Sequence, residues 1–316
     1  MSRRTERSYE AEGPGEVAPH SQAQCSGPEV NGPAAQAEFT SLLRELCSPC
    51  TAPLAGSGAT SSNGRRAGAE VTVLDRVIQQ AIAQVLTPLF DPHFSAYSYG
   101  FRYGKRAHQA VRSAEAAYRE GYTQAVDCDL KSCFDTVNHS RLLRLLTRRV
   151  TDRRVLRLIR RYLRAGVQMP EGHREATTQG VPQGGPLSPL LANVMLDPLD
   201  KELEKRGLRF ARYGDDFLIL VRSAPAARRV MASITRFVDS RLGLVVNRQK
   251  SQAAPLHRCA FLGFTFRRKK LVWSDKVLVR FKDRIRQITS RRRGIRIPSR
   301  IEELRRYAVG WLNYFG

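Results

Sequence analysis

Apolar residues recur every three to four positions in several stretches of the chain, and this spacing predicts amphipathic helices. In residues 73–89 the spacing is regular, and Pro88 marks the expected end of the helix. In residues 152–164 the side opposite the apolar stripe is almost wholly arginine. Any one of these arginines suits a solvated helix face, but as a set they favour contact with phosphate groups.

Two further helices carry start signals. Asn138 or Ser140 is placed to cap a helix in residues 139–150. Ser188, followed directly by proline, is placed to cap a helix that stops at Gly207. These signals give both helices defined ends.

Short apolar runs between the helices predict β-strands. One such strand runs into a turn within residues 124–134, and others are expected at 210–213, 216–221, 243–247 and 259–266. Gly214-Asp215 separates two of these runs and suits a two-residue type II′ hairpin turn, in which glycine takes the first position. Helices, a hairpin and further strands in mixed order indicate an α+β fold, with helices covering one face of an antiparallel sheet.

Composition divides the chain into two parts. The 316 residues carry a formal net charge of +24, and 42% of them are hydrophobic, which suffices for a core. Residues 1–70 are rich in Gly, Pro, Ala and Ser and carry a net charge of −2, so the basic excess belongs to residues 71–316. The first part is expected to be largely disordered. The second is expected to bind a polyanion, most simply nucleic acid.

Apolar segments of the kind that enter membranes are not found. The sequence has no apolar run of about 18 residues. No apolar stretch follows a basic segment at its N-terminus. We therefore expect no membrane partner and a cytoplasmic location.

The segment RYGDDFLIL, residues 212–220, places Asp215 and Asp216 directly before an apolar strand. Burying a carboxylate is costly, and two neighbouring carboxylates repel each other, so a divalent cation is the usual means of holding both ionised. Asp129 follows another apolar strand segment and is the best candidate for a third ligand. Three such aspartates in a basic protein suit a two-metal centre for phosphoryl transfer. The alternative is an exposed acidic turn.

Several segments occur together in an order that is typical of one family. They are TVLDRVIQQAIAQVLTPLFDPHFSAYSYGFR (72–102), AVDCDLKSCFDTVNH (125–139), QGVPQGGPLSPLLANVMLDPLD (179–200), RYGDDFLIL, NRQKS (247–251), FLGF (261–264) and GWLNYF (310–315). Over about residues 72–316 the chain resembles the bacterial group II intron-encoded reverse transcriptase/maturase family. The QGVPQGGPLSP block is the most specific of the matching motifs.

The resemblance implies a right-hand polymerase fold and a function. Residues 1–70 would be a low-complexity head, 71–258 a remnant of the fingers with the palm, and 259–316 the start of a helical thumb or maturase region. The implied function is RNA-directed DNA synthesis from a primer 3′-OH, with dNTPs as substrates and an RNA template, together with binding and splicing of intron RNA. The implied cofactor is Mg²⁺, as two ions, for which Mn²⁺ is a possible substitute.

The resemblance also assigns roles to individual residues. Asp129, Asp215 and Asp216 would be the catalytic and metal-binding carboxylates. Phe134 would exclude a 2′-hydroxyl, and its alternative is a plain core residue. Tyr213 would lie near the primer terminus. The remaining nucleotide-binding residues would be Gln183, Gly184, Arg102 and Lys250, the last of which could protonate the leaving pyrophosphate or be an ordinary surface lysine.

The sequence departs from the family at both ends. No equivalent of the family's N-terminal finger region is recognised before residue 72, and the chain stops just past GWLNYF. YGDD also replaces the commoner YADD. Two other interpretations therefore stand beside the polymerase: a maturase-like RNA-binding protein without synthesis, and an inactive truncated product. Viral RNA-dependent RNA polymerases share the GDD turn, but the QGVPQGGPLSP block is unlike theirs.

Overall fold

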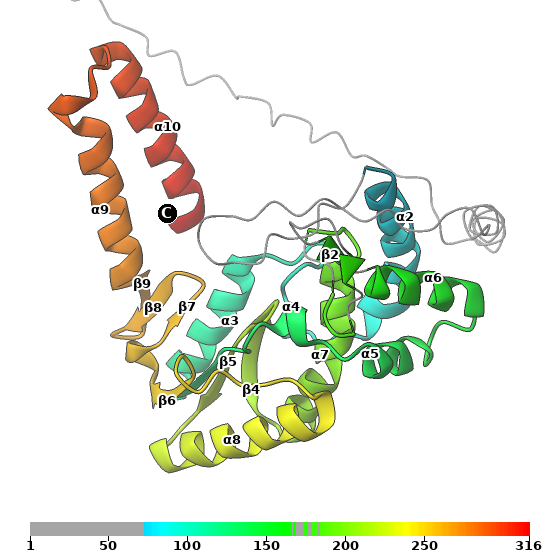
Figure 1. Ribbon diagram of the computed structural model, residues 1–316. Coiled ribbons are helices and arrows are strands. Elements are labelled where there is room, and N and C mark those ends of the chain that lie inside the picture. The colour runs from blue at the N-terminus through cyan, green and yellow to red at the C-terminus, as the bar shows by residue number, and fades with distance from the viewer. Residues whose placement is uncertain (1–72, 166, 169–173, 176–177, 182–183) are drawn as a thin grey trace, which may run out of the picture. The chain divides into compact units, whose positions relative to one another are not determined.

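An antiparallel sheet of four strands lies at the centre of the fold (Figure 1). Its strands, in spatial order, are β4 (Arg209–Tyr213), β5 (Asp216–Val221), β1 (Gln124–Cys128) and β6 (Gln252–Pro255). The two inner strands, β5 and β1, are almost wholly apolar except at their ends, as suits strands that are buried on both faces.

The computed structural model describes residues 73–165, 167–168, 174–175, 178–181 and 184–316. All of these lie within one unit of the chain, Leu46–Gly316. The head predicted for residues 1–70 lies outside the described residues, so its disorder and the domain boundaries stay predictions. Within the described ranges, no helix is long and apolar enough to cross a membrane.

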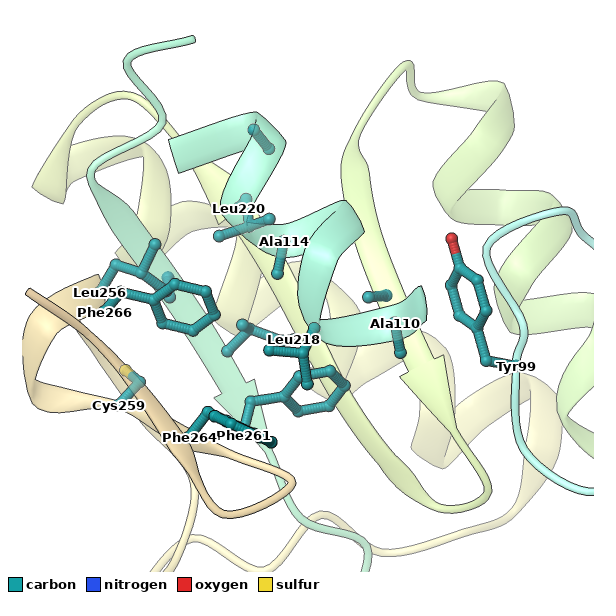
Figure 2. Packing of buried hydrophobic residues seen from close by; sticks show 14 residues of the cluster. Tyr99, Ala110, Ala114, Leu218, Leu220, Leu256, Cys259, Phe261, Phe264 and Phe266 are labelled. Carbon is teal, nitrogen blue, oxygen red and sulfur yellow. The ribbon is translucent and has the colours of Figure 1, made fainter. Parts of the chain in front are cut away.

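One face of the central sheet is covered by helix α3 (Ala107–Arg119) and by a second, three-stranded sheet. Ala110 and Ala114 of α3 pack on Leu218 and Leu220 of β5, as Figure 2 shows. The helix presents alanines to the sheet, which allow its backbone to approach closely. Phe261, like the other phenylalanines of the second sheet, completes this core.

The opposite face of the sheet is covered by helix α8 (Ala224–Phe237), whose Met231 contacts Cys128. Successive side chains of a strand point to opposite faces, so Cys128 and Ala125 of β1 lie on different sides. The predicted α+β fold with an antiparallel palm sheet is confirmed. The prediction that helices cover only one face of this sheet is wrong. Both faces of the two central strands are apolar, so each face is covered by other elements of the fold.

The second sheet consists of β7 (Ala260–Phe261), β8 (Phe264–Arg267) and β9 (Lys270–Trp273). It leads into two long helices, α9 (Asp275–Thr289) and α10 (Ile297–Phe315). Trp273 donates a hydrogen bond from Nε1 to the carbonyl oxygen of Phe315, 2.9 Å away. Aromatic rings pack around this bond, so the end of α10 is fixed to the small sheet.

The remaining helices follow the predicted patterns closely. Helix α2 (Val73–Phe90) passes Pro88 and ends two residues later. Helix α5 (His139–Leu146) is capped by Asn138, whose side chain accepts a hydrogen bond from the backbone of Arg141 at 3.0 Å. The other helices of this region are α6 (Arg153–Arg164), which buries its apolar stripe, the short α4 (Cys133–Thr136), and α7 (Ser188–Lys205).

Three further sequence predictions differ from the structure. The single strand expected at 259–266 is instead the antiparallel pair β7 and β8, with a turn at 262–263. Residues 243–247 form only a single bridge, between Val246 and Leu130, and the fourth strand of the sheet is β6, five residues later. The residues of β6, QAAP, have low strand propensity, so pairing with β1 rather than sequence decides their conformation. At α7, Leu187 takes the N-cap position and Ser188 lies inside the helix.

A buried arginine joins α7 to the hairpin of β4 and β5. Arg212 is fully buried and forms an ion pair with Asp200 of α7, at 2.6 Å. Its other donors reach Asn193 Oδ1 at 2.9 Å, the carbonyl oxygen of Gly214 at 2.8 Å and Ser98 Oγ at 2.7 Å. All five guanidinium hydrogens therefore have acceptors, as a buried charge requires.

Replacing Asp200 by asparagine leaves the Arg212 charge buried without a counter-charge. We expect a loss of unfolding free energy of about 3 kcal/mol, measured by chemical denaturation. Glu202→Gln is the matched control on the same helix, because Glu202 pairs with Arg206 at the surface and its loss should cost less than about 1 kcal/mol. Equal losses in the two variants would contradict a special role for the buried pair.

Candidate active site

The turn between β4 and β5 carries Asp215 at its tip. Tyr213 pairs with Asp216 across the hairpin, so Gly214 and Asp215 alone form the turn. Gly214 has a φ of +67°, and Asp215 is not among the residues with positive φ. This matches the predicted type II′ turn, in which only the first central residue takes a positive φ.

Asp129 lies one residue beyond β1, at the same end of the sheet. The register pairs Cys128 of β1 with Phe217 of β5, so the next step along both strands places Asp129 opposite Asp216. The backbone N–H of Asp129 donates to Ser251 Oγ at 3.0 Å. Asn247 Nδ2 donates to Asp129 Oδ2 at 3.0 Å and fixes the carboxylate. The structure thus brings the three predicted aspartates to one edge of the sheet.

Electrostatics confirm that these carboxylates influence one another. Asp216 is exposed at the start of β5, but partial desolvation of its carboxyl raises its pKa, repulsion from Asp215 and Asp129 raises it further, and Lys250 opposes the rise. Lys250 Nζ lies 3.9 Å from Asp129 Oδ2, and the lysine side chain is largely exposed. A cation at this edge would relieve the repulsion and favour the ionised form of all three aspartates.

The donor types at this edge suit a hard divalent cation. Among the described residues, no three acidic, cysteine or histidine side chains converge closely enough to hold a metal by themselves. Mg²⁺ is commonly bound by one or two carboxylates, with water and substrate phosphates as the other ligands. The aspartates therefore fit a site that is completed when a triphosphate binds.

A fourth acid, Asp127, lies close to the three and was missed by the sequence analysis. It stands two residues before Asp129 on β1, and Gln252 Nε2 of β6 contacts its carboxylate at 3.5 Å. Burial raises its pKa to about 6, with smaller contributions from Asp216 and Asp129. Strand alternation was the available signal, because residues two apart on a strand share a face.

Phe134 lies on α4, directly after the strand that carries Asp129. Its ring is half-buried, and its carbonyl oxygen accepts a hydrogen bond from the backbone of Val181 at 2.6 Å. This bond joins α4 to the start of the VPQGG segment. Gln183 lies outside the described residues, whereas Gly184 is exposed, has a φ of +85° and has open space around it. The nucleotide-binding roles of these residues stay predictions.

Arg102 does not suit the nucleotide-binding role predicted for it. Its guanidinium donates to the carboxylate of Asp91, at 2.6 Å from Nε, and to the backbone carbonyls of Asp91, Ser95 and Ser98. These bonds use all of its donors, and only 8% of the side chain is exposed. Arg102 therefore stabilises the loop before α3 by hydrogen bonds. None of its N–H groups is available to donate to a triphosphate.

Tyr213 is half-buried beside the turn, and its ring centroid lies 6.2 Å from that of Phe101. Gly100 packs on the same turn so closely that a Cβ added to it would lie 2.2 Å from the backbone nitrogen of Gly214. The loop at residues 95–102 is thus in direct contact with the aspartate hairpin.

An acidic hairpin beside a third aspartate, at one edge of an antiparallel sheet, is the arrangement expected of a polymerase palm. The family model described as reverse transcriptase (RNA-dependent DNA polymerase) matches residues 61–266, more than half of the chain. The model of the group II intron maturase-specific domain matches residues 278–316. The chain therefore belongs to the group II intron reverse transcriptase/maturase family.

Curated relatives agree with this assignment. Protein YkfC of Escherichia coli is 29% identical, over 54% of this chain and 55% of that protein. The group II intron-encoded protein LtrA of Lactococcus lactis is 31% identical, over 46% of this chain and 23% of that protein. The putative COX1/OXI3 intron 2 protein of Saccharomyces cerevisiae is 41% identical over 26% of this chain. The chain spans about half or less of the length of these relatives.

Solved structures with similar folds include the apo telomerase from Candida tropicalis truncated from its C-terminal domain, with a TM-score of 0.47 and 15% identity. The match covers 63% of this chain and 44% of that one. A partial Cas6-RT-Cas1–Cas2 complex is similar at a TM-score of 0.38 and 28% identity, over 68% of this chain and 39% of that one.

The raised pKa of Asp127 predicts a pH-dependent stability. Because the pKa of Asp127 in the folded state, about 6, exceeds its ordinary value of 3.8, ionisation of Asp127 destabilises the fold as pH rises from about 4 to 6. Asp127→Asn keeps the shape and removes the charge, so we expect it to be more stable than the wild-type chain by about 2 kcal/mol at pH 7.5. The difference should shrink towards pH 4 in denaturation curves. A gain that is independent of pH would contradict this assignment.

Proposed function

We propose that the chain is an RNA-directed DNA polymerase that extends a DNA primer on an RNA template with dNTPs, and that it also binds intron RNA. The observation that carries the proposal is the placement of Asp129 opposite Asp216 and beside Asp215 at one edge of the palm sheet. Membership of the reverse transcriptase family supports it. A cytoplasmic location remains part of the proposal.

The aspartates would hold two divalent cations, Mg²⁺ or in its place Mn²⁺, which when bound activate the primer 3′-OH and stabilise the leaving pyrophosphate. Asn247 keeps the Asp129 carboxylate in one orientation, so this ligand is preorganised. Partial desolvation of the Asp216 carboxyl and repulsion from Asp215 and Asp129 make its ionised form depend on a nearby positive charge. Lys250, beside Asp129, holds an ammonium proton within reach of the centre, which suits protonation of pyrophosphate.

Selection of the substrate would fall to the residues around α4. Phe134 follows the Asp129 strand by one short turn, and its half-buried ring would stand against the sugar of an incoming nucleotide. Gly184 is exposed, and an added Cβ would have no described atom within 4 Å, so the backbone here would leave room for the nucleotide. Gln183 and Tyr213 keep their proposed places, against the nucleotide and near the primer terminus.

A specific surface favours RNA binding as a second function. Nine exposed arginines lie on α5, on α6 and in the segment between them, and no carboxylate of the described residues forms an ion pair with any of them. They are Arg144, Arg148, Arg149, Arg153, Arg154, Arg157, Arg160, Arg161 and Arg164. We call this set the α5–α6 arginine surface. Exposed arginines at such density, without ion pairs to the described carboxylates, suit a phosphate backbone.

Primer extension tests the polymerase directly. With Mg²⁺, dNTPs and a DNA primer on an RNA template, we expect the wild-type chain to add nucleotides. Asp215→Ala combined with Asp216→Ala should abolish the addition, because the turn then offers no ligand to a cation. Gel separation of the labelled primer measures the result.

The matched control for this experiment is Asp239→Ala together with Asp283→Ala, two exposed aspartates far along the chain from the centre. This variant should extend primers like the wild-type chain. Extension that survives the loss of Asp215 and Asp216 would refute the proposed centre. A folded wild-type chain that binds RNA but adds nothing would favour the maturase-like function without synthesis.

The salt dependence of RNA binding tests the α5–α6 arginine surface. Each phosphate contact releases counterions, so replacing Arg157, Arg160 and Arg161 by glutamine should reduce the slope of log Kd against log salt by about 2. The control replaces three exposed arginines of α8, which are Arg228, Arg229 and Arg236, and should leave the slope near its wild-type value. Titration of labelled RNA between 50 and 300 mM salt, on the order of the physiological range, measures both. Equal slopes for the two variants would contradict a localised surface.

A further inference from the structure

Phe101 has an unfavourable backbone conformation and an exposed ring. Its φ is +59°, in the left-handed region that bulky residues rarely adopt, and 53% of the residue is exposed. A large apolar side chain usually gains stability by burial, and here the ring gains little. The chain thus keeps an aromatic residue where both the backbone and the solvent disfavour it. Such positions gather at functional sites when the surrounding structure enforces them.

The residues on either side of Phe101 are fixed to the catalytic hairpin and to the loop. Gly100 lies against the backbone of Gly214, where a Cβ would be 2.2 Å from the nitrogen, and its carbonyl oxygen accepts a hydrogen bond from Asn193 Nδ2 at 2.9 Å. The backbone N–H of Tyr99 donates to the carbonyl of Arg212 at 2.8 Å. Arg102 has all its donors bonded within the loop. The chain must therefore turn at Phe101, and the ring is directed outward.

The ring of Phe101 lies over the turn that carries the aspartates. A Cβ added to Gly214 would be 3.0 Å from Phe101 Cε2, and the ring of Tyr213 is 6.2 Å away at an angle of 41°. Gly214 immediately precedes Asp215. The same contact gives a reason for the glycine of YGDD, because an alanine there would press on the Phe101 ring. Tyr103, two residues further on, is 98% exposed, and none of the ring contacts found among the described residues involves it.

We propose that Phe101 is a nucleotide-binding residue that packs its ring on the base at the primer 3′ end. The inference rests on the proposed function, which requires the primer 3′-OH to reach the aspartates. A strand that ends beside Asp215 passes over Gly214, where the exposed face of Phe101 meets it. Aromatic rings stack on any nucleobase, so the contact is independent of sequence and suits a residue at a moving primer terminus. Phe101 and Tyr213 together would form the platform for the last base.

Photo-crosslinking tests the contact without synthesis. A primer with 5-iodouracil as its 3′-terminal base is annealed to an RNA template and irradiated with the full chain in EDTA. We expect the crosslinked peptide to contain Phe101. Phe101→Asn should lose the crosslink and bind the primer–template about tenfold more weakly, while Phe101→Tyr, which keeps a ring, should retain both. Tyr103→Asn is the matched control from the same loop and should behave as the wild-type chain.

Asparagine tolerates a positive φ better than phenylalanine does, so Phe101→Asn also separates binding from stability. We expect its Tm to equal or exceed that of the wild-type chain while affinity falls. A lowered Tm in Phe101→Asn with unchanged affinity would show that the ring only supports the hairpin, and would overturn the proposal. So would wild-type affinity and crosslinking in that variant, or no primer–template binding by the wild-type chain.

Different results would refute the proposed polymerase activity and the proposed contact between Phe101 and the primer. A wild-type chain that crosslinks through Phe101 but extends no primer with Mg²⁺ would refute the polymerase activity and support the contact. Extension that proceeds equally well in the wild-type chain and in Phe101→Asn, with no crosslink in either, would support the polymerase and overturn the contact.

Discussion

The ion pair between Arg212 and Asp200 is the constraint on which the rest of the site depends. A guanidinium without solvent needs an acceptor for each of its five hydrogens. Those acceptors come from α7, from the loop before α3 and from the aspartate turn itself. Three segments distant in sequence are therefore held at one point. The carbonyl of Gly214 is among the acceptors, so the turn that presents Asp215 cannot shift without leaving a buried charge unsatisfied.

The arginines of this chain divide into structural and exposed groups. Arg212 and Arg102 are buried, fully hydrogen-bonded and used to fix the hairpin and its neighbouring loop. The α5–α6 arginine surface has no partners among the described carboxylates and faces solvent. The basic residues therefore have two roles. A few fix the aspartate hairpin and its neighbouring loop, and many are exposed, where they could contact a polyanion. Only the exposed group would contribute to the proposed salt-dependent binding of RNA.

Much of the fold and of the site was predictable from local patterns. The hairpin followed from Gly214-Asp215 between two apolar runs, and α6 followed from its apolar stripe. The prediction of a strand at residues 243–247 was wrong, because these residues lie in a loop. Asn247 of this loop holds Asp129 by hydrogen bonds. Arg102 was misassigned, since sequence motifs do not reveal which donors are already occupied. Asp127 was overlooked although strand alternation places it on the same face as Asp129, two residues further along.

By itself, the sequence determined the family, the three aspartates and the elements that carry them, because hydrophobic period, turn chemistry and motif order are local properties of the chain. Only the tertiary structure decided what surrounds them: the register that sets Asp129 opposite Asp216, the second helical layer on the sheet and the exposed, strained Phe101 over the turn. These features arise from pairings between residues 87 to 113 positions apart, which are Asp129 with Asp216, Cys128 with Met231, and Phe101 with Gly214. Such pairings depend on which partners satisfy buried charges and hydrogen bonds, and that information is not carried by any one segment.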